Sequence, residues 1–309
     1  MRENSNSDAS VCQLTVVKVL FKKLNMKRII ISIFLAMAIS AFADDFVKDA
    51  EPAILEVHYT RTEVRDTTKR DSKFYQDPVM LRIGKNMSLF CGTKRLWDDS
   101  LSAVNHKLEF ELYIKECNDN AKNGTNNLLC GYYWPYIYKN YPQGKVTEKA
   151  DFDGICHRYE EDWEKQDWKI TDSVKTIIGY ECFMATAEFR GRRWTAWFTP
   201  EIPIQDGPWK LCGLPGLILE AYDTNRDYSF TADGIRQNGI SDVGYMAYDE
   251  DGGVYKCSRD KFFNDWWRFA NSNFAGKMRA LFGHKPHPED FGKFVVNYDK
   301  EEIDYPHDL

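Results

Sequence analysis

The pattern of apolar and polar positions predicts a chain built mainly of β-strands. Residues 54–61 alternate between the two classes, and residues 79–90 do so around a short break that is typical of a hairpin. The clearest alternation runs through residues 181–199, with a turn at Arg190–Arg192, and residues 217–232 repeat it. We therefore expect antiparallel hairpins that form a sheet or a half-barrel.

A change of period near the C-terminus predicts one long amphipathic helix over about residues 258–282. Its apolar side chains recur at the i, i+3, i+4 spacing of a helix that buries one face. Ser258 is a suitable N-cap and Gly283 a suitable residue just beyond the C-terminus. Residues 101–117 show a weaker helical spacing. The predicted class is mainly β (α+β), with the C-terminal helix packed on the sheet.

The N-terminal stretch carries the pattern of an export signal. Met26–Arg28 is basic, residues 29–39 are apolar, and Ala41–Ala43 is an A-x-A cleavage site. The apolar stretch is too short to favour a stable membrane anchor. We expect cleavage after Ala43 and a soluble protein of the periplasm or the medium.

This signal also sets the expected boundaries of the chain. Residues 1–25 precede a complete signal peptide with its own methionine, so we interpret them as an upstream extension and Met26 as the true start. Residues 26–43 are then the signal peptide, and residues 44–309 form a single β-rich domain. The full chain has a formal net charge of −6, and the segment removed is basic. The acidic mature chain argues against nucleic acid as a partner.

A dense stretch of prolines, glycines and tryptophans occupies residues 196–219. Within it, Leu214–Leu217 predicts a type II turn with Gly at the position of positive φ. The hexapeptide resembles the motif that names the GLPGLI family, exported Bacteroidetes proteins without an established activity. Ala196–Pro203 and Gly207–Lys210 also resemble that family. The motif consists of Gly213, Leu214, Pro215, Gly216, Leu217 and Ile218.

Cysteine usage agrees with export. The chain has eight cysteines, of which Cys12 precedes the cleavage site, and several of the others are expected to pair in an oxidising envelope. Cys182 and Cys212 are candidates because each lies close to one of the segments that carry the family resemblance. A bridge between them would contribute roughly 3–4 kcal/mol in the chain-entropy account.

The sequence contains none of the common catalytic or cofactor motifs. It lacks a nucleophile elbow, a zincin helix, a Walker A loop and a dinucleotide fingerprint. His284, His287 and Asp290 could gather around a metal, but the intervening prolines favour a surface loop. Cys156 and His157 are neighbours on a predicted strand and should point to opposite faces. We therefore predict no cofactor, no metal and no catalytic residues.

Two further stretches could hold a ligand or carry chemistry. The aromatic residues of 132–138 could stack on a planar ligand, although packing on a β-rich body is the simpler interpretation. The carboxylates of residues 159–168 could form an acid–base pair, although a solvated edge is the simpler interpretation.

Three hypotheses for the function follow. The first is a non-catalytic binding or carrier protein of the cell envelope, with an apolar ligand, lipid or peptide held by the sheet. The second is an interaction module of an outer-membrane or secretion complex, which requires an exposed motif with Leu214 and Leu217 accessible. The third is an envelope hydrolase, which requires convergence of two carboxylates such as Asp151, Asp153 or Glu201.

Overall fold

The computed structural model describes residues 47–70, 74–123, 135–247, 253–272 and 299–305. The chain divides into the units Met1–Lys48 and Asp49–Leu309, and nearly all described residues belong to the second. The predicted upstream extension, the signal peptide and its cleavage site lie outside the described residues. The histidines considered as metal ligands, His284 and His287, also lie outside them.

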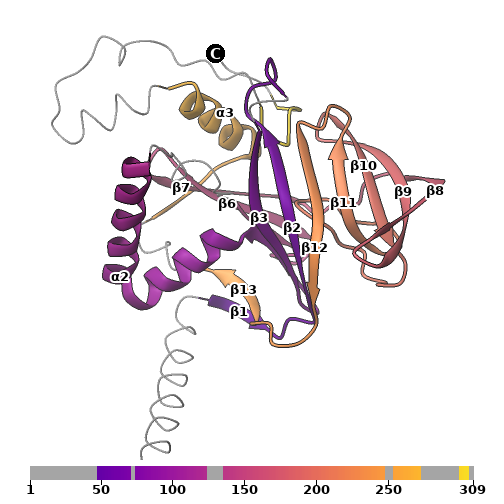
Figure 1. Cartoon of the computed structure of the whole chain (residues 1–309), viewed down its shortest axis with the longest axis horizontal. Helices are drawn as coiled ribbons and strands as arrows, with labels where there is room; N and C mark the ends of the chain where they lie inside the picture. Colours follow the sequence, from indigo (N-terminus) through magenta and orange to yellow (C-terminus); the bar gives the residue numbers. More distant parts are fainter. Residues whose placement is uncertain (1–46, 71–73, 124–134, 248–252, 273–298, 306–309) are drawn as a thin grey trace, which may run out of the picture. The chain divides into compact units, whose positions relative to one another are not determined.

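Strands make up most of the described part of the chain, with one helix between β4 and β5 and a second after β14 (Figure 1). The first half contains β1 (Val47–Glu51), β2 (Leu55–Val64), β3 (Phe74–Ile83), β4 (Ser88–Gly92), α2 (Thr93–Asn123), β5 (Tyr136–Lys139), β6 (Lys145–Phe152) and β7 (Ile155–Asp162). The second half contains β8 (Lys169–Ile177), β9 (Tyr180–Phe189), β10 (Arg192–Thr199), β11 (Leu217–Asp223), β12 (Tyr228–Arg236), β13 (Val243–Met246), β14 (Val254–Lys256) and α3 (Arg259–Ala270).

Twelve of these strands form one sheet in the order β14-β7-β6-β5-β4-β3-β2-β12-β11-β10-β9-β8, and β1 pairs with β13 in a second sheet. Neighbours in the large sheet are antiparallel except β14 and β7, which run parallel. The sheet is open, with β14 and β8 at its edges. The prediction of a mainly β fold is therefore confirmed.

The hairpins expected from the alternation are present. β3 pairs with β4, and β9 pairs with β10 around the tight turn at Arg190–Gly191. β11 and β12 form the hairpin expected between residues 217 and 232. On β10 the alternating residues Trp194, Ala196 and Phe198 are all buried, because one face of the strand packs into the core.

Helix α3 begins where the sequence indicated but is short. The Ser258 side chain accepts a hydrogen bond from the Lys261 backbone N–H at 3.3 Å, which confirms the N-cap. The helix ends at Ala270, so the predicted long helix to residue 282 is not shown, and residues 273–282 lie outside the described part. Asn271 and Ser272 explain the end, because their side chains bond the carbonyls of the last turn.

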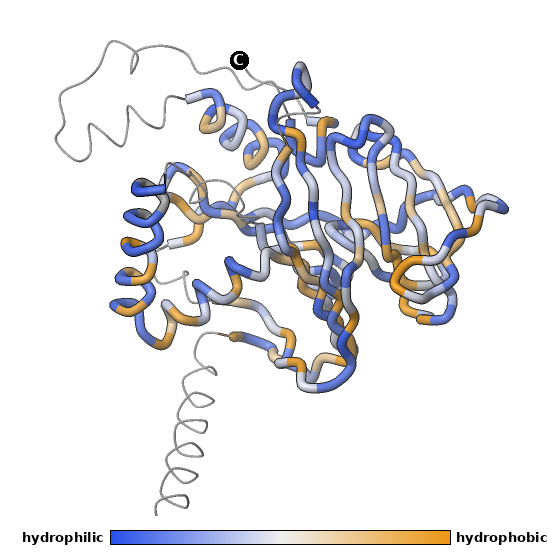
Figure 2. Tube along the Cα trace, viewed as in Figure 1, coloured by the Kyte–Doolittle hydropathy of each residue, from blue (hydrophilic) through white to orange (hydrophobic). Residues whose placement is uncertain are grey.

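Helix α2 confirms the helical spacing at residues 101–117 and begins earlier, at Thr93. It is interrupted at Asn105, whose backbone has φ −154° and ψ 77°, so the helix consists of two arms. Apolar positions occur along both arms (Figure 2). The second arm leaves Leu108, Phe110 and Ile114 exposed.

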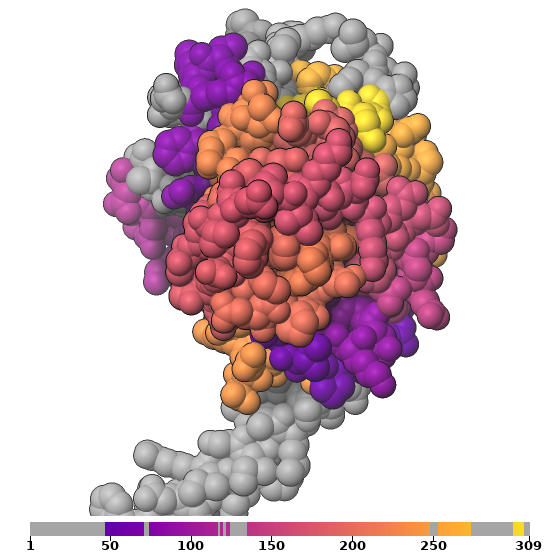
Figure 3. All heavy atoms as spheres, turned by 90° about the vertical axis from the view of Figure 1, so that its right-hand side faces the viewer, coloured from indigo at the N-terminus to yellow at the C-terminus, as the bar shows by residue number. Residues whose placement is uncertain are grey.

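The main core is filled by large aromatic and aliphatic side chains. Trp194 and Trp209 are almost completely buried, and their ring centroids lie 5.2 Å apart. The same core includes residues of β2, β3, β4, β10, β11 and β12. In the space-filling view of Figure 3, the red atoms of β8–β10 lie beside the orange atoms of β11 and of residues 200–216, which connect β10 to β11. Because side chains fill this core, it counts against the hypothesis of a carrier that encloses an apolar ligand inside the main core.

Candidate functional site

The GLPGLI-like motif is a buried corner between β10 and β11. Leu214 and Leu217 are 1 % and 0 % exposed, and Ile218 is also fully buried. The backbone is held at three points by residues 202–206: the Gly213 N–H donates to Gln205 O, and two further N–H groups of the motif donate to carbonyls of the same segment. The hypothesis that this loop is an exposed docking surface is therefore wrong, because its leucines belong to the core.

The backbone conformations of Gly213 and Gly216 differ from the prediction. Positive φ occurs at Gly213 (φ 90°) and not at Gly216, so the predicted type II turn is wrong. A Cβ at position 216 would lie 2.1 Å from the carbonyl oxygen of Thr199. Gly216 is therefore needed for close approach of two backbones, while Gly213 provides the positive φ.

The cysteines selected as a disulfide pair are free thiols in the structure. Both are buried, but they face different neighbours: the Cys182 Sγ lies 3.6 Å from Tyr180 O and the Cys212 Sγ lies 3.8 Å from Glu164 O. The predicted bridge is thus absent, because the fold places the two thiols against different backbone carbonyls. Burial raises the pKa of each thiol to about 11.

We expect these two thiols to be protected in the folded protein and reactive after unfolding. At pH 8, iodoacetamide should leave Cys182 and Cys212 unmodified in native buffer, because buried thiols of raised pKa hold few thiolates. In guanidinium without reductant, both should be alkylated, as peptide mass spectrometry would detect. A peptide that becomes alkylated only after reduction would instead show that the disulfide exists.

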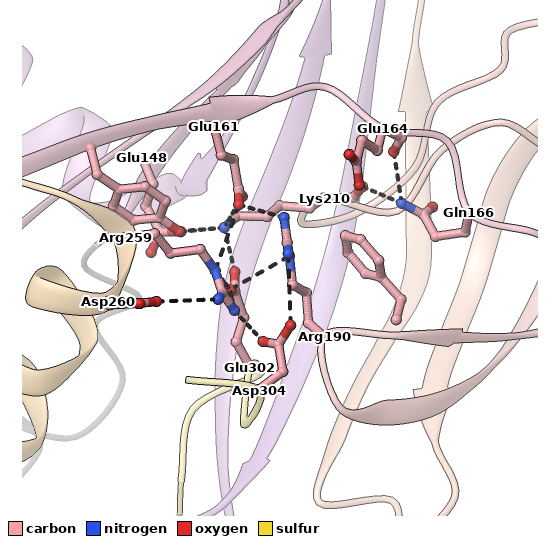
Figure 4. A network of polar contacts seen from close by, with 12 residues as sticks. Glu148, Glu161, Glu164, Gln166, Arg190, Lys210, Arg259, Asp260, Glu302 and Asp304 are labelled. Carbon is pink, nitrogen blue, oxygen red and sulfur yellow. Dashed lines mark hydrogen bonds and ion pairs between the residues drawn. The ribbon is translucent and has the colours of Figure 1, made fainter. Parts of the chain in front are cut away.

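The loop before the motif places a lysine in the core (Figure 4). The Lys210 side chain is 2 % exposed, and its ammonium lies 2.7 Å from Glu161 Oε1 and 3.0 Å from Glu148 Oε2. It also donates to Glu302 and to the hydroxyl of Tyr159. Burial alone would lower the pKa of Lys210, but the three carboxylates outweigh it and raise that pKa.

Two arginines extend this network of ion pairs around Lys210. Arg259, at the start of α3, donates from Nε to Glu302 Oε2 at 2.7 Å and also pairs with Asp304. Arg190, in the β9–β10 turn, lies 2.5 Å from Glu161 Oε2. The network therefore joins β6, β7, the 208–211 loop, α3 and the C-terminal residues. Its carboxylates are neutralised by cations, so we interpret it as structural.

Sequence reasoning missed this network. It interpreted the carboxylates of residues 159–168 as a solvated edge, which holds for Glu160 and Glu164 but is wrong for Glu161. A usable signal was present, because Lys210 stands between Trp209 and Leu211 in an otherwise apolar stretch. A lysine in such a setting is expected to need buried carboxylate partners.

A groove between the β6–β7 turn, β14 and α3 is the best candidate for a ligand site. Its volume is about 370 Å³, within the range of small-molecule sites. Aromatic side chains and charges of both signs line it: Phe152, Asp153, Ile155, His157, Tyr255, Lys261, Asp265, Arg268 and Phe269. Helix α3 supplies the last four, and it contacts β7 directly.

His157 is one of the residues that line this groove. Its ring stacks on Phe152 with centroids 3.8 Å apart, and its Nδ1 lies 3.0 Å from Ile155 O. Because a carbonyl only accepts, Nδ1 carries a proton and Nε2 can accept from a ligand when the ring is neutral. Burial lowers the pKa of His157, which favours the neutral ring at pH 7.

The charges of the groove are arranged around Asp265. Its carboxylate pairs with Lys261 and lies 3.9 Å from both Arg268 Nη1 and His157 Nε2. The Arg268 side chain is 59 % exposed, so its guanidinium remains accessible to an anion. The site thus combines flat apolar surface with an accessible cation, and Asp153 adds a carboxylate at the rim.

The remaining candidates from the sequence are held in other ways. Asp151 pairs with Arg95, and Glu201 accepts from the Glu181 backbone N–H at 3.0 Å. Each of these two carboxylates therefore has its own partner. Asp153 is one of the residues that line the groove. Residues 132–134 of the aromatic stretch lie outside the described residues. Tyr136 and Tyr138 are buried and stack with centroids 6.1 Å apart, as expected for strand packing.

Among the residues that the structure describes, no cluster of three or more His, Cys, Asp or Glu side chains is suited to hold a metal. Neither helix described there is both long and apolar enough to cross a bilayer.

Comparison with known proteins gives a short family match. Residues 189–220 match the model of a family described as a protein of unknown function (Porph_ging). The matched stretch contains β10, the buried corner and the start of β11. No curated protein matches the chain.

Among solved structures, PNGF-II is similar in two crystal forms. The structure in space group P21 has a TM-score of 0.44 at 13 % identity, over 70 % of this chain and 33 % of that chain. The structure in space group C2 has a TM-score of 0.43 at 13 % identity, over 71 % of this chain and 34 % of that chain. The chain therefore spans about one third of the length of PNGF-II.

Proposed function

We propose that the protein is a non-catalytic binding protein of the cell envelope, and that it holds a small ligand in the groove between β7 and α3. The location rests on the export signal at residues 26–43, with its A-x-A site. The binding role rests on the groove of about 370 Å³ with its aromatic walls and mixed charges.

The lining favours a small zwitterion with an aromatic or apolar part, such as an amino acid or a short peptide. Phe152, Tyr255 and Phe269 offer surface for the apolar part. The exposed Arg268 guanidinium suits a carboxylate, and Asp153 at the rim suits an ammonium group. The ligand is therefore expected to carry both charges near a flat side chain.

Binding is favoured over catalysis by the pairing of the charged groups. Asp265, the carboxylate nearest to His157, is neutralised by Lys261 one helical turn away. A general base oriented by a carboxylate would instead bond it through Nδ1, which here bonds Ile155 O. In this proposal His157 accepts a hydrogen bond from the bound molecule through Nε2, because Nδ1 is bonded to Ile155 O.

Calorimetry and native mass spectrometry test this proposal directly. Protein purified from its own periplasm would be examined for a co-purifying small molecule, and then titrated with amino acids, dipeptides, aromatic carboxylates and monosaccharides. We expect a zwitterion to bind, and Arg268→Ala to weaken its binding about tenfold or more, equivalent to about 1.4 kcal/mol. Arg193→Ala is the matched control, because that arginine is similarly exposed and lies on β10, outside the groove lining.

Two outcomes would contradict the proposal. One is the absence of binding across the panel at millimolar concentrations. The other is an affinity that falls equally in the Arg268 and Arg193 variants, since this would place the ligand outside the groove.

A further inference from the structure

The connection between β12 and β13 contains an asparagine followed by a glycine, Asn238–Gly239. Strand β12 makes its last pair with β2 at Arg236, so residues 237–242 cross unpaired from the large sheet to the small one (Figure 1). Both Asn238 and Gly239 are exposed. A Cβ built on Gly239 meets nothing within 4 Å, so this part of the connection borders open space.

Hydrogen bonds do not hold this pair in place. Within the described part of the chain, neither the Asn238 side chain nor the Gly239 N–H has a hydrogen-bond partner. The carboxamide carbon of Asn238 and the backbone nitrogen of Gly239 can therefore approach each other. Glycine favours this approach, because it carries no hindering side chain and its backbone reaches more conformations than that of any other residue.

The related dipeptides of the chain differ in chemistry or lie outside the described residues. In the described part, Asp-Gly pairs occur at 153–154, 206–207 and 233–234. Their carboxylates resist attack by a nucleophile, because they already carry negative charge. The Asn-Gly pair at 123–124 has its glycine outside the described residues. The connection between β12 and β13 therefore holds the pair with the clearest structural case for reaction.

Asn225, in the β11–β12 turn, shows what protects an asparagine that is equally exposed. The next residue is Arg226, whose backbone N–H donates to Asp223 O at 2.9 Å. Its guanidinium also lies over the Tyr222 ring, 3.8 Å from the centroid. The nitrogen after Asn225 is thus held by a hydrogen bond and carries a large side chain, so Asn225 should keep its amide.

We propose that Asn238 is a site of spontaneous deamidation in the folded protein. The Gly239 nitrogen attacks Cγ of Asn238 and closes a cyclic imide. The carboxamide C–N bond breaks, and its nitrogen leaves as ammonia with the proton given up by Gly239. Water then opens the imide at either carbonyl, which leaves aspartate or isoaspartate.

Each such event adds one negative charge to the connection between β12 and β13. The isoaspartate product also lengthens the backbone by one carbon, so it changes the path of the chain between the two sheets. Residues 237–242 are not among those that line the ligand groove. The proposal is therefore independent of the proposed function.

Peptide mass spectrometry of aged protein tests the proposal. The full chain is incubated in mildly alkaline native buffer and, in parallel, in the same buffer with urea. The mass gain of each asparagine peptide gives its rate of deamidation, and chromatography separates the aspartate and isoaspartate forms. Hydroxylamine cleaves cyclic imides, so chain cleavage after residue 238 provides a second readout.

We expect Asn238 to react in native buffer within about threefold of its rate in urea, because the contacts of the fold leave this pair unrestrained. Gly239→Ala should slow the native reaction by about tenfold or more, since a methyl group hinders the attack.

Arg226→Gly is the matched variant, because it places a glycine after the second exposed asparagine. Glycine suits the positive φ of position 226 (φ 55°), and the N–H bond to Asp223 O can persist. Asn225 should then react readily in urea but about tenfold more slowly, or less, in native buffer.

Three results would overturn the proposal. The first, which requires no substitution, is an Asn238 that keeps its amide in native buffer while it reacts in urea. Equal native rates for the parent and Gly239→Ala would exclude attack by the residue 239 nitrogen. Equal rates of Asn225 in native buffer and urea for Arg226→Gly would show that a bonded N–H gives no protection.

Discussion

Replacing Lys210 with methionine is expected to lower the free energy of unfolding by about 3–5 kcal/mol. The substitution keeps an apolar stem of similar length but leaves Glu148, Glu161 and Glu302 without their shared buried cation. An uncompensated buried charge is among the most destabilising changes in a core. Urea denaturation followed by tryptophan fluorescence measures the effect, provided that the m-value stays unchanged.

The matched control is Lys145→Met, which removes an exposed lysine paired with Asp162. Both residues lie on the β6–β7 hairpin, which also carries Glu148 and Glu161. Exposed ion pairs contribute little, so the midpoint should hardly change. Adding Glu302→Gln to the Lys210 variant should recover part of the loss, because one buried carboxylate is then neutral. A Lys210→Met protein as stable as the parent would show that the lysine is solvated in solution.

Gly216→Ala is expected to destabilise the protein by about 3 kcal/mol, at the upper end of the range for overpacking. The added Cβ would meet the Thr199 carbonyl oxygen at 2.1 Å and its carbon at 2.6 Å. Both are backbone atoms, which cannot rotate away as a side chain could. The corner between β10 and β11 would have to open, and thermal or urea denaturation reports the loss.

Gly234→Ala provides the control for this prediction. A Cβ built at Gly234 on β12 meets nothing within 4 Å, and the residue does not need positive φ. Alanine should therefore leave stability unchanged or raise it by up to about 1 kcal/mol, through a smaller loss of chain entropy. Equal destabilisation of the two variants would contradict the close-approach argument.

The strands could be predicted because their signal is local. Alternation along residues 181–199 marks which side chains face the core, and Trp194, Ala196 and Phe198 are buried as that pattern requires. The end of α3 could not be predicted from periodicity, since apolar residues continue beyond Ala270. Polar side chains at Asn271 and Ser272 compete for the last carbonyls, and this local chemistry outweighs the pattern.

The candidate sites were less accessible to sequence reasoning. The groove brings His157 of β7 beside Asp265 of α3, residues that lie on separate elements and follow no motif. The motif with the strongest family resemblance proved to be core, with Leu214 and Leu217 buried. A short signature of glycine and proline reports backbone requirements, and these exist equally in structural corners and in functional loops.

The sequence by itself determined the mainly β class, the hairpin pairings and the start of α3 at its Ser258 cap. Each of these depends on neighbours within a few residues. Only the tertiary structure decided the partners of Lys210, because Glu161 and Glu302 lie 49 and 92 residues away along the chain. Charges become partners when folding brings them out of water together, and no local pattern encodes that distance.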